Sequence, residues 1–224
     1  MMDAICAIAT SYGSGAISIV RASGKDSIKM INEIFKGPDL TKVKSHTISY
    51  GSIVYEGEVI DEVLVSVFLP PRTYTREEIV EINCHGGMFV TNKILETLLK
   101  IGFRLADSGE FTKRAYLNGR IDLTQAEAVM DIISSGNDMM LKNSNKALRK
   151  EITKMITSLR ERLLGLIAKI EVNIDYPEYD DAIEMSNEIV KPKISEIKEN
   201  EELSFFADFS KNGRALSLSS LSTL

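Results

Sequence analysis

The sequence EINCHGG (Glu81–Gly87), followed by GEFTKRAYLNGRIDLTQAEA (Gly109–Ala128), decides how this chain is interpreted. Glu81 lies inside an apolar run that is typical of a β-strand, where a carboxylate requires a partner. Two glycines, Gly86 and Gly87, follow the run and precede a helix-like segment. This combination favours a small, polar, partly anionic ligand bound at the end of a strand.

The part of the chain up to about residue 122 alternates strand-like and helix-like segments. A Gly-rich turn, Ser11–Gly15, separates the first two strand patterns, and a second pair reads as a hairpin around Glu56-Gly57. Gly13 and Gly15 would let a backbone or a ligand approach closely. Strands are predicted at 3–10, 16–21, 46–55, 63–69, 79–83 and 103–106, and helices at 27–35 and 88–101.

The remainder of the chain is helical in pattern. Apolar residues from Leu148 to Ile170 recur every three or four positions and predict one long amphipathic helix over residues 143–174, ended by Pro177. A shorter helix is predicted before it, from Thr124 as N-cap to Ser134. A third is predicted over 186–203 with an interruption at Pro192. The fold class is therefore α+β, with domains at 1–120 and 121–209 and an unmatched Ser/Leu-rich tail at 210–224.

Composition sets limits on the function. A hydrophobic content of 44% with 26% charged residues is ordinary for a soluble globular protein. The net charge of −5 argues against a broad basic face that grips nucleic acid. Two distant cysteines and the absence of a secretory signal indicate a reduced, cytoplasmic protein with no metal site. No apolar run approaches about 18 residues, so no membrane association is expected.

Glu81 allows two interpretations that the sequence does not separate. Its carboxylate could accept two hydrogen bonds from the amidine-like edge of a pterin or guanine ring. Alternatively, it could form a structural ion pair with a nearby lysine or arginine. Cys84 and His85 are adjacent on the same strand and point to opposite faces, so they are interpreted as packing residues. Motifs for phosphate binding, zinc proteases and serine hydrolases are absent from the sequence, and no catalytic residue is assigned.

Two arginines are further candidates for ligand binding. Arg21 ends the strand after the Gly-rich turn, and the alternative is that it is a solvated strand end. Arg120 follows Asn118-Gly119 and could bind the carboxylate of a glutamate-tailed ligand. The alternative for Arg120 is a basic surface loop paired with Glu110 and Asp122.

Four segments closely resemble the amino-terminal part of the MnmE/TrmE tRNA-modification GTPases: ATSYGSGAISIVRASG, YTREEIVEINCHGG, GEFTKRAYLNGRIDLTQAEAVMDII and NIDYPEYDD. The resemblance implies a mixed α/β amino-terminal domain, related to folate-dependent aminomethyltransferases, that forms a homodimer and precedes a helical domain. It also implies that this domain binds a tetrahydrofolate derivative, such as formyl- or methylene-tetrahydrofolate. The implied folate contacts are Arg21, Glu81 and Arg120, with Glu81 at the pterin edge and the arginines at the anionic or carbonyl parts.

In that family, a G domain that uses GTP, Mg²⁺ and K⁺ is inserted within the helical domain. With the partner MnmG (GidA), the full enzyme adds an aminomethyl-type group to C5 of the wobble uridine in tRNA. Because this sequence contains no P-loop and the G domain is not present in it, we expect folate binding without GTP hydrolysis. The turn SYGSGA departs from the Pro- and Arg-containing, Gly-richer turn of the family, so no ligand contact is assigned to that loop. Whether the chain is itself an enzyme stays open. The alternatives are an autonomous folate-dependent one-carbon transferase and a helical interaction module with an exposed stripe from Leu148 to Ile170.

Overall fold

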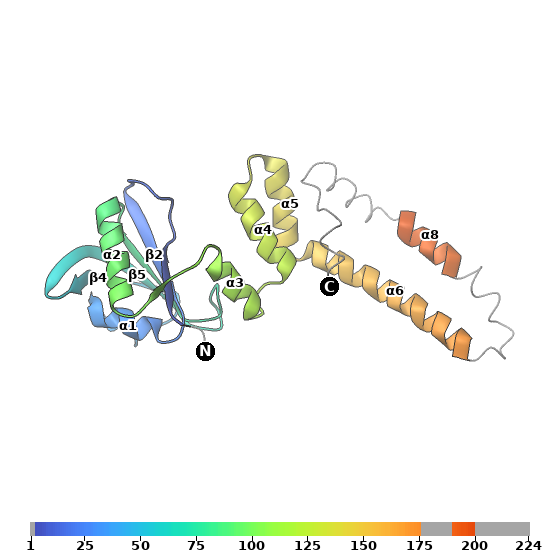
Figure 1. Cartoon of the computed structure of the whole chain (residues 1–224), viewed down its shortest axis with the longest axis horizontal. Helices are drawn as coiled ribbons and strands as arrows, with labels where there is room; N and C mark the ends of the chain where they lie inside the picture. Colours follow the sequence, from blue (N-terminus) through green and yellow to red (C-terminus); the bar gives the residue numbers. More distant parts are fainter. Residues whose placement is uncertain (1–2, 176–189, 200–224) are drawn as a thin grey trace. The chain divides into compact units, whose positions relative to one another are not determined.

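The computed structural model describes residues 3–175 and 190–199 (Figure 1). They fall into two compact units, and the boundary along the chain lies between Ala126 and Glu127. The first unit contains a sheet with helices, whereas the second contains helices. The predicted fold class, a mixed α/β part followed by an all-α part, is confirmed.

The first unit is built on a seven-stranded sheet with the order β3-β4-β5-β6-β2-β1-β7. The β1–β7 pair is parallel, and the other neighbouring strands are antiparallel. Glu56 and Gly57 have φ values of 52° and 85° and form the tight turn predicted between β4 and β5. The strands are β1 (Ile5–Ile8), β2 (Ile17–Ser23), β3 (Phe35–Lys36), β4 (Thr47–Tyr55), β5 (Glu58–Phe68), β6 (Ile79–His85) and β7 (Arg104–Leu105).

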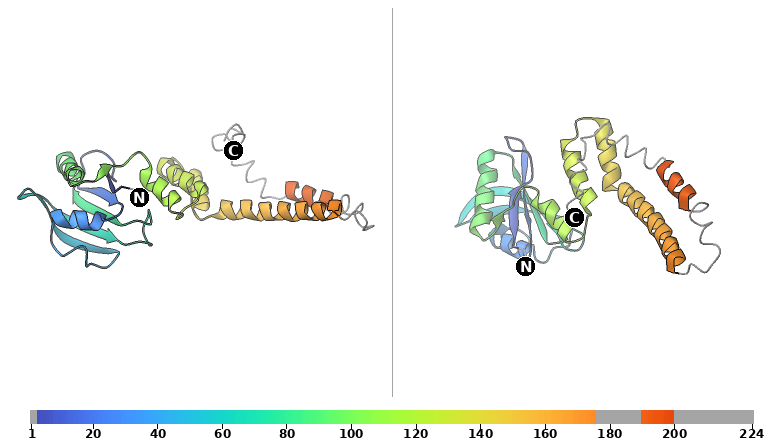
Figure 2. Two further views of the ribbon diagram at one scale, coloured as in Figure 1. Left: turned by 60° about the horizontal axis from the view of Figure 1, so that its bottom comes forward. Right: turned by 45° about the vertical axis from the view of Figure 1, so that its right-hand side comes forward.

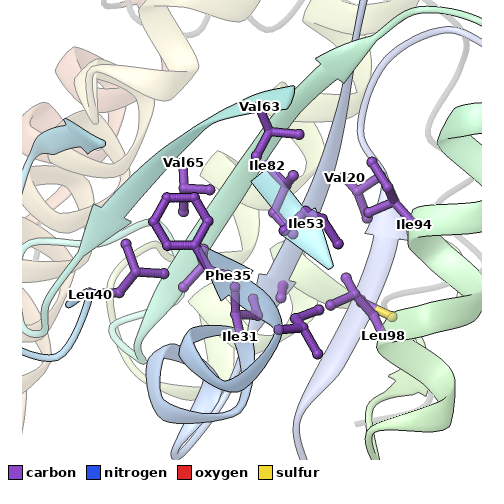
Figure 3. Packing of buried hydrophobic residues seen from close by; sticks show 14 of the residues in the cluster. Val20, Ile31, Phe35, Leu40, Ile53, Val63, Val65, Ile82, Ile94 and Leu98 are labelled. Carbon is purple, nitrogen blue, oxygen red and sulfur yellow. The ribbon is translucent and has the colours of Figure 1, made fainter. Parts of the chain in front are cut away.

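Two helices, α1 (Ser27–Ile34) and α2 (Met88–Lys100), pack against the sheet and form the core. Alternate residues of the central strands point toward them, because successive side chains of a strand face opposite sides. The buried side chains of the strands and of the two helices meet in one core. Figure 3 shows part of it, with Val20 and Ile82 from the strands and Ile31, Ile94 and Leu98 from the helices. The other face of the sheet carries exposed apolar side chains on neighbouring strands. We call Ile48, Tyr50 and Leu64 the exposed sheet face.

A short helix, α3 (Glu110–Leu117), is fastened by the buried side chain of Arg114, which is only 2% exposed. Its guanidinium donates to Glu110 Oε1 at 2.9 Å and to the backbone carbonyl of Asp3 at 2.8 Å. It also forms an ion pair with Glu77 at 3.3 Å, and Arg104 binds Glu110 from β7 at 2.6 Å. This network ties α3 to the start of the chain and to the loop before β6.

The second unit corrects the prediction of one long helix over residues 143–174. Two helices stand there instead, α5 (Asp138–Leu148) and α6 (Glu151–Asp175) (Figure 2). The break occurs at Lys150, whose φ of 64° is left-handed and cannot continue a right-handed helix. Leu148 packs against Ala128 and Ala147, so it does not extend the apolar stripe of α6.

Two smaller predictions about helix ends are also wrong. Helix α4 (Leu123–Ser134) begins after Asp122, not after Thr124. Asp122 Oδ1 accepts from the Gln125 backbone N–H, and Gln125 Oε1 accepts from the Asp122 N–H, which is a reciprocal capping arrangement. Pro192 lies in the first turn of α8 (Lys191–Glu199), where a missing N–H costs nothing, and it does not interrupt the helix. Pro177 and the rest of the DYPEYDD segment after Asp175, both ends of the helix predicted over 186–203 (residues 186–189 and 200–203) and the tail at 210–224 lie outside the described residues.

Candidate functional site

Arg21 and Glu81 face each other directly on the paired strands β2 and β6. The Arg21 Nε and Nη2 both donate to Glu81 Oε1, at 2.8 and 2.7 Å. Within residues 3–175 and 190–199, no hydrogen bond from the protein reaches the second carboxylate oxygen, Oε2. The structural ion pair considered for Glu81 is thus present, and one acceptor of the same carboxylate stays open to a ligand.

Aromatic rings surround the guanidinium of Arg21. Its Cζ lies 5.9 Å from the ring centroid of Tyr74 and 5.6 Å from that of Phe111. Arg120 approaches the same tyrosine, with its Cζ 5.0 Å from the ring centroid. These distances are those of cation–π contacts. The structure therefore brings Arg21 and Arg120 to the same ring of Tyr74, which the sequence had not singled out, and Glu81 is joined to this pair through Arg21.

The loop that carries Tyr74 is held against α3 by hydrogen bonds. The Tyr74 hydroxyl lies 2.9 Å from Thr112 Oγ1, one residue after Phe111. The Asn118 side-chain amide donates to the Thr75 carbonyl at 2.6 Å, and Arg76 donates to the Asn118 carbonyl at 3.0 Å. The loop and α3 thus form one continuous hydrogen-bonded part of the site. The buried Arg114 side chain holds α3 in place through its bonds to Asp3 and Glu77.

Arg120 extends from the end of α3. Its backbone N–H donates to the Ala115 carbonyl at 2.9 Å, after Gly119 has turned the chain with a φ of 68°. The pairing with Glu110 considered from the sequence is not formed, because Glu110 binds Arg104 and Arg114 instead. Among the described residues Arg120 forms no ion pair, so its exposed guanidinium is available to an anionic group.

The Gly-rich turn near β2 is explained by backbone packing. The Gly15 N–H donates to the Gly86 carbonyl at 2.9 Å, and the Gly86 N–H donates to the Ala16 carbonyl at 3.1 Å. A Cβ at Gly86 would lie 2.4 Å from the Gly15 oxygen, so only glycine fits there. The cavity beside Gly13 has a volume of about 10 Å³, enough for a single water molecule.

Both cysteines are buried, and the His85 ring is paired with a carboxylate. The Cys84 thiol is buried and lies 3.4 Å from the Ser18 carbonyl, whereas the exposed His85 ring binds Asp61 Oδ1 at 2.7 Å. Burial raises the pKa of Cys84, and it raises the pKa of Cys6 to about 12. Neither thiol is therefore a nucleophile at neutral pH. In the described part of the chain, no group of three or more His, Cys, Asp or Glu side chains could hold a metal. No described helix has the length and apolarity needed to span a membrane.

Fold and site together define a sheet domain with a charged and aromatic site, followed by a helical domain. Residues 4–120 match the family model described as GTP-binding protein TrmE N-terminus, and residues 123–217 match the MnmE helical domain. The chain therefore belongs to the MnmE (TrmE) family of tRNA modification GTPases, and the resemblance noted in the sequence is confirmed.

Several curated relatives carry the name tRNA modification GTPase MnmE. The relative from Acholeplasma laidlawii is 55% identical over 194 residues, which cover 86% of this chain and 43% of the relative. The relative from Bacillus anthracis is 51% identical over 216 residues, which cover 96% of this chain and 47% of the relative. The chain thus spans less than half the length of these relatives.

Proposed function

We propose that the chain binds a tetrahydrofolate derivative, formyl- or methylene-tetrahydrofolate, at Arg21, Glu81 and Arg120. The observation that carries this proposal is that Arg21 and Arg120 both lie at the ring of Tyr74 while Arg21 also binds Glu81. Membership of the MnmE family supports it further. A folate combines a flat hydrogen-bonding ring with an anionic tail, and this site combines an open carboxylate oxygen with an unpaired guanidinium.

Each residue has a separate role in this proposal. The open oxygen of Glu81 accepts a hydrogen bond from the N–H and NH₂ edge of the pterin. Arg21 neutralises the Glu81 carboxylate, so the pair favours a neutral donor edge over a second cation. Arg120 binds the glutamate carboxylate of the ligand, for which its planar, forked set of donors is suited.

Isothermal titration with 5-formyl-tetrahydrofolate tests this proposal. Wild-type protein should bind, and Glu81→Gln should bind at least about tenfold more weakly, because losing a charged hydrogen-bond partner costs about 1.5–3 kcal/mol. Glu58→Gln, at the exposed start of β5, is the matched control and should bind like wild type. A loss of twofold or less in Glu81→Gln would contradict the assigned role of Glu81.

We further propose that the chain supplies the folate-binding part of an enzyme that, with MnmG, modifies C5 of the wobble uridine in tRNA. Residues 1–120 would form the folate-binding and dimerisation domain, and residues 121–209 part of the helical domain. The names of the relatives support this assignment. The chain alone should bind folate without hydrolysing GTP, and tRNA would be reached through the full complex. Turnover of a one-carbon folate by the chain alone would favour an autonomous transferase instead.

We also propose that two copies associate through the exposed sheet face. Ile48, Tyr50 and Leu64 are 66%, 65% and 46% exposed on two adjacent strands, which is costly for a solvated surface. Sedimentation at rising concentration should give a dimer for wild type and a monomer for Leu64→Asp. A monomeric wild-type protein would contradict this proposal.

A further inference from the structure

Tyr74 contacts both arginines of the site through its ring and contacts α3 through its hydroxyl. The Arg120 Cζ lies 5.0 Å from the ring centroid, and the Arg21 Cζ lies 5.9 Å from it. The hydroxyl oxygen is 2.9 Å from Thr112 Oγ1. The hydroxyl of Tyr74 is therefore held by a hydrogen bond, while its ring contacts the guanidinium groups of Arg21 and Arg120.

The two arginines depend on this ring to different extents. Arg21 has three further restraints, since it donates twice to Glu81 and also lies near the Phe111 ring. For Arg120, the contact with Tyr74 is the one side-chain interaction found among the described residues. An exposed arginine has many rotamers, and restraining them before a ligand arrives lowers the entropic cost of binding. The position of the Arg120 guanidinium is thus set chiefly by Tyr74.

We propose that Tyr74 is a positioning residue that holds the Arg120 guanidinium ready for an anion and thereby selects ligands with an anionic tail over tail-less pterins. This inference rests on the proposed folate site. A planar guanidinium stacks on an aromatic face and keeps its edge donors free for a carboxylate. Lysine in place of Arg120 would keep the charge but lose the planar stack and the fork.

The preference for a ligand with an anionic tail can be measured as a ratio, the dissociation constant of a tail-less pterin divided by that of a tailed folate. The two probes are 6-methyltetrahydropterin, which has no anionic tail, and 5-formyl-tetrahydrofolate. Arg120→Ala should abolish most of the preference for the tailed ligand. Tyr74→Leu should reduce it by about threefold to tenfold, the range of one to two cation–π contacts. Tyr74→Phe keeps the ring and should change it by about twofold or less.

Two controls separate positioning from a general loss of structure. Tyr116→Leu removes an exposed tyrosine of the same helix α3 and should leave the ratio unchanged. The ring current of Tyr74 should shift the Arg120 δ protons upfield in ligand-free wild type and in Tyr74→Phe, but not in Tyr74→Leu. If Tyr74→Leu does not fold, Arg120→Lys tests the same stack and should lower the ratio in the same direction.

The possible outcomes distinguish this inference from the proposed function. If wild type binds both probes and both Tyr74→Leu and Arg120→Lys keep the full tail preference, the role of Tyr74 is overturned and the folate site stands. If wild type binds neither probe, the proposed folate site fails and the role of Tyr74 fails with it. A reduced preference in Tyr74→Leu together with a lost ring-current shift supports the inference.

Discussion

Replacing the buried Arg114 with methionine is expected to destabilise the first unit by about 3 kcal/mol. Methionine has a similar length but leaves the carboxylates that Arg114 neutralises without that partner. Breaking a buried ion pair from one side typically costs about 3–5 kcal/mol. The lower end applies here, because Glu110 keeps its 2.6 Å ion pair with Arg104 and Glu77 keeps a hydrogen bond from Ser23.

Urea unfolding of the full chain, followed by circular dichroism, measures this loss. A loss of about 3 kcal/mol corresponds to a fall in melting temperature of about 10 °C for a unit of this size. Lys113→Met changes the neighbouring exposed residue on α3 and should stay within about 0.5 kcal/mol of wild type. A second substitution, Glu77→Gln, should recover part of the stability lost in Arg114→Met. A loss below about 1 kcal/mol in Arg114→Met would show that water solvates these carboxylates and would refute the reasoning.

Three further predictions concern acid stability, one helix break and the thiols. The hydrogen bond from Arg104 lowers the pKa of Glu110 to about 2 in the folded state. The stability that the ionised Glu110 carboxylate contributes is therefore complete above about pH 5 and is lost as the pH falls toward 2. Urea titrations over this range should show a smaller fall in the free energy of unfolding for Glu110→Gln than for wild type. Lys150→Gly should raise the melting temperature slightly, because glycine removes a left-handed strain of about 1 kcal/mol, whereas Lys154→Gly inside α6 should lower it. Ellman's reagent should leave Cys6 and Cys84 unmodified in native protein and label both after unfolding, and fast labelling of the native protein would contradict their burial.

The sheet and the candidate residues could be predicted because their signals are local. Alternating residues around Val20 and Ile82 indicate strands, and Glu81 is conspicuous as a carboxylate inside an apolar run. The contact between Arg21 and Glu81 could not be predicted in the same way. It depends on which strands are neighbours and on their register, and the two residues are 60 positions apart.

Other features were missed because the sequence carries a misleading signal or none. Apolar spacing continues from Leu148 to Ile152 across the helix break, and a lysine at position 150 gives no warning of a left-handed residue. Arg114 follows Lys113 and resembles part of a basic surface. The spacing of Glu110 and Arg114, four residues apart, was an available sign of pairing. Tyr74 lies in a loop, where side-chain direction depends on tertiary contacts.

The placement of Arg21 and Glu81 on paired central strands has a consequence for how the protein opens. The ion pair joins Arg21 on β2 to Glu81 on β6, so these strands cannot separate without breaking it. A ligand that bridges the pair would disfavour complete opening of the sheet, and not only the fraying of a loop. Saturating folate should therefore slow hydrogen exchange at the most protected amides of β2 and β6, as well as at the amides that touch the ligand.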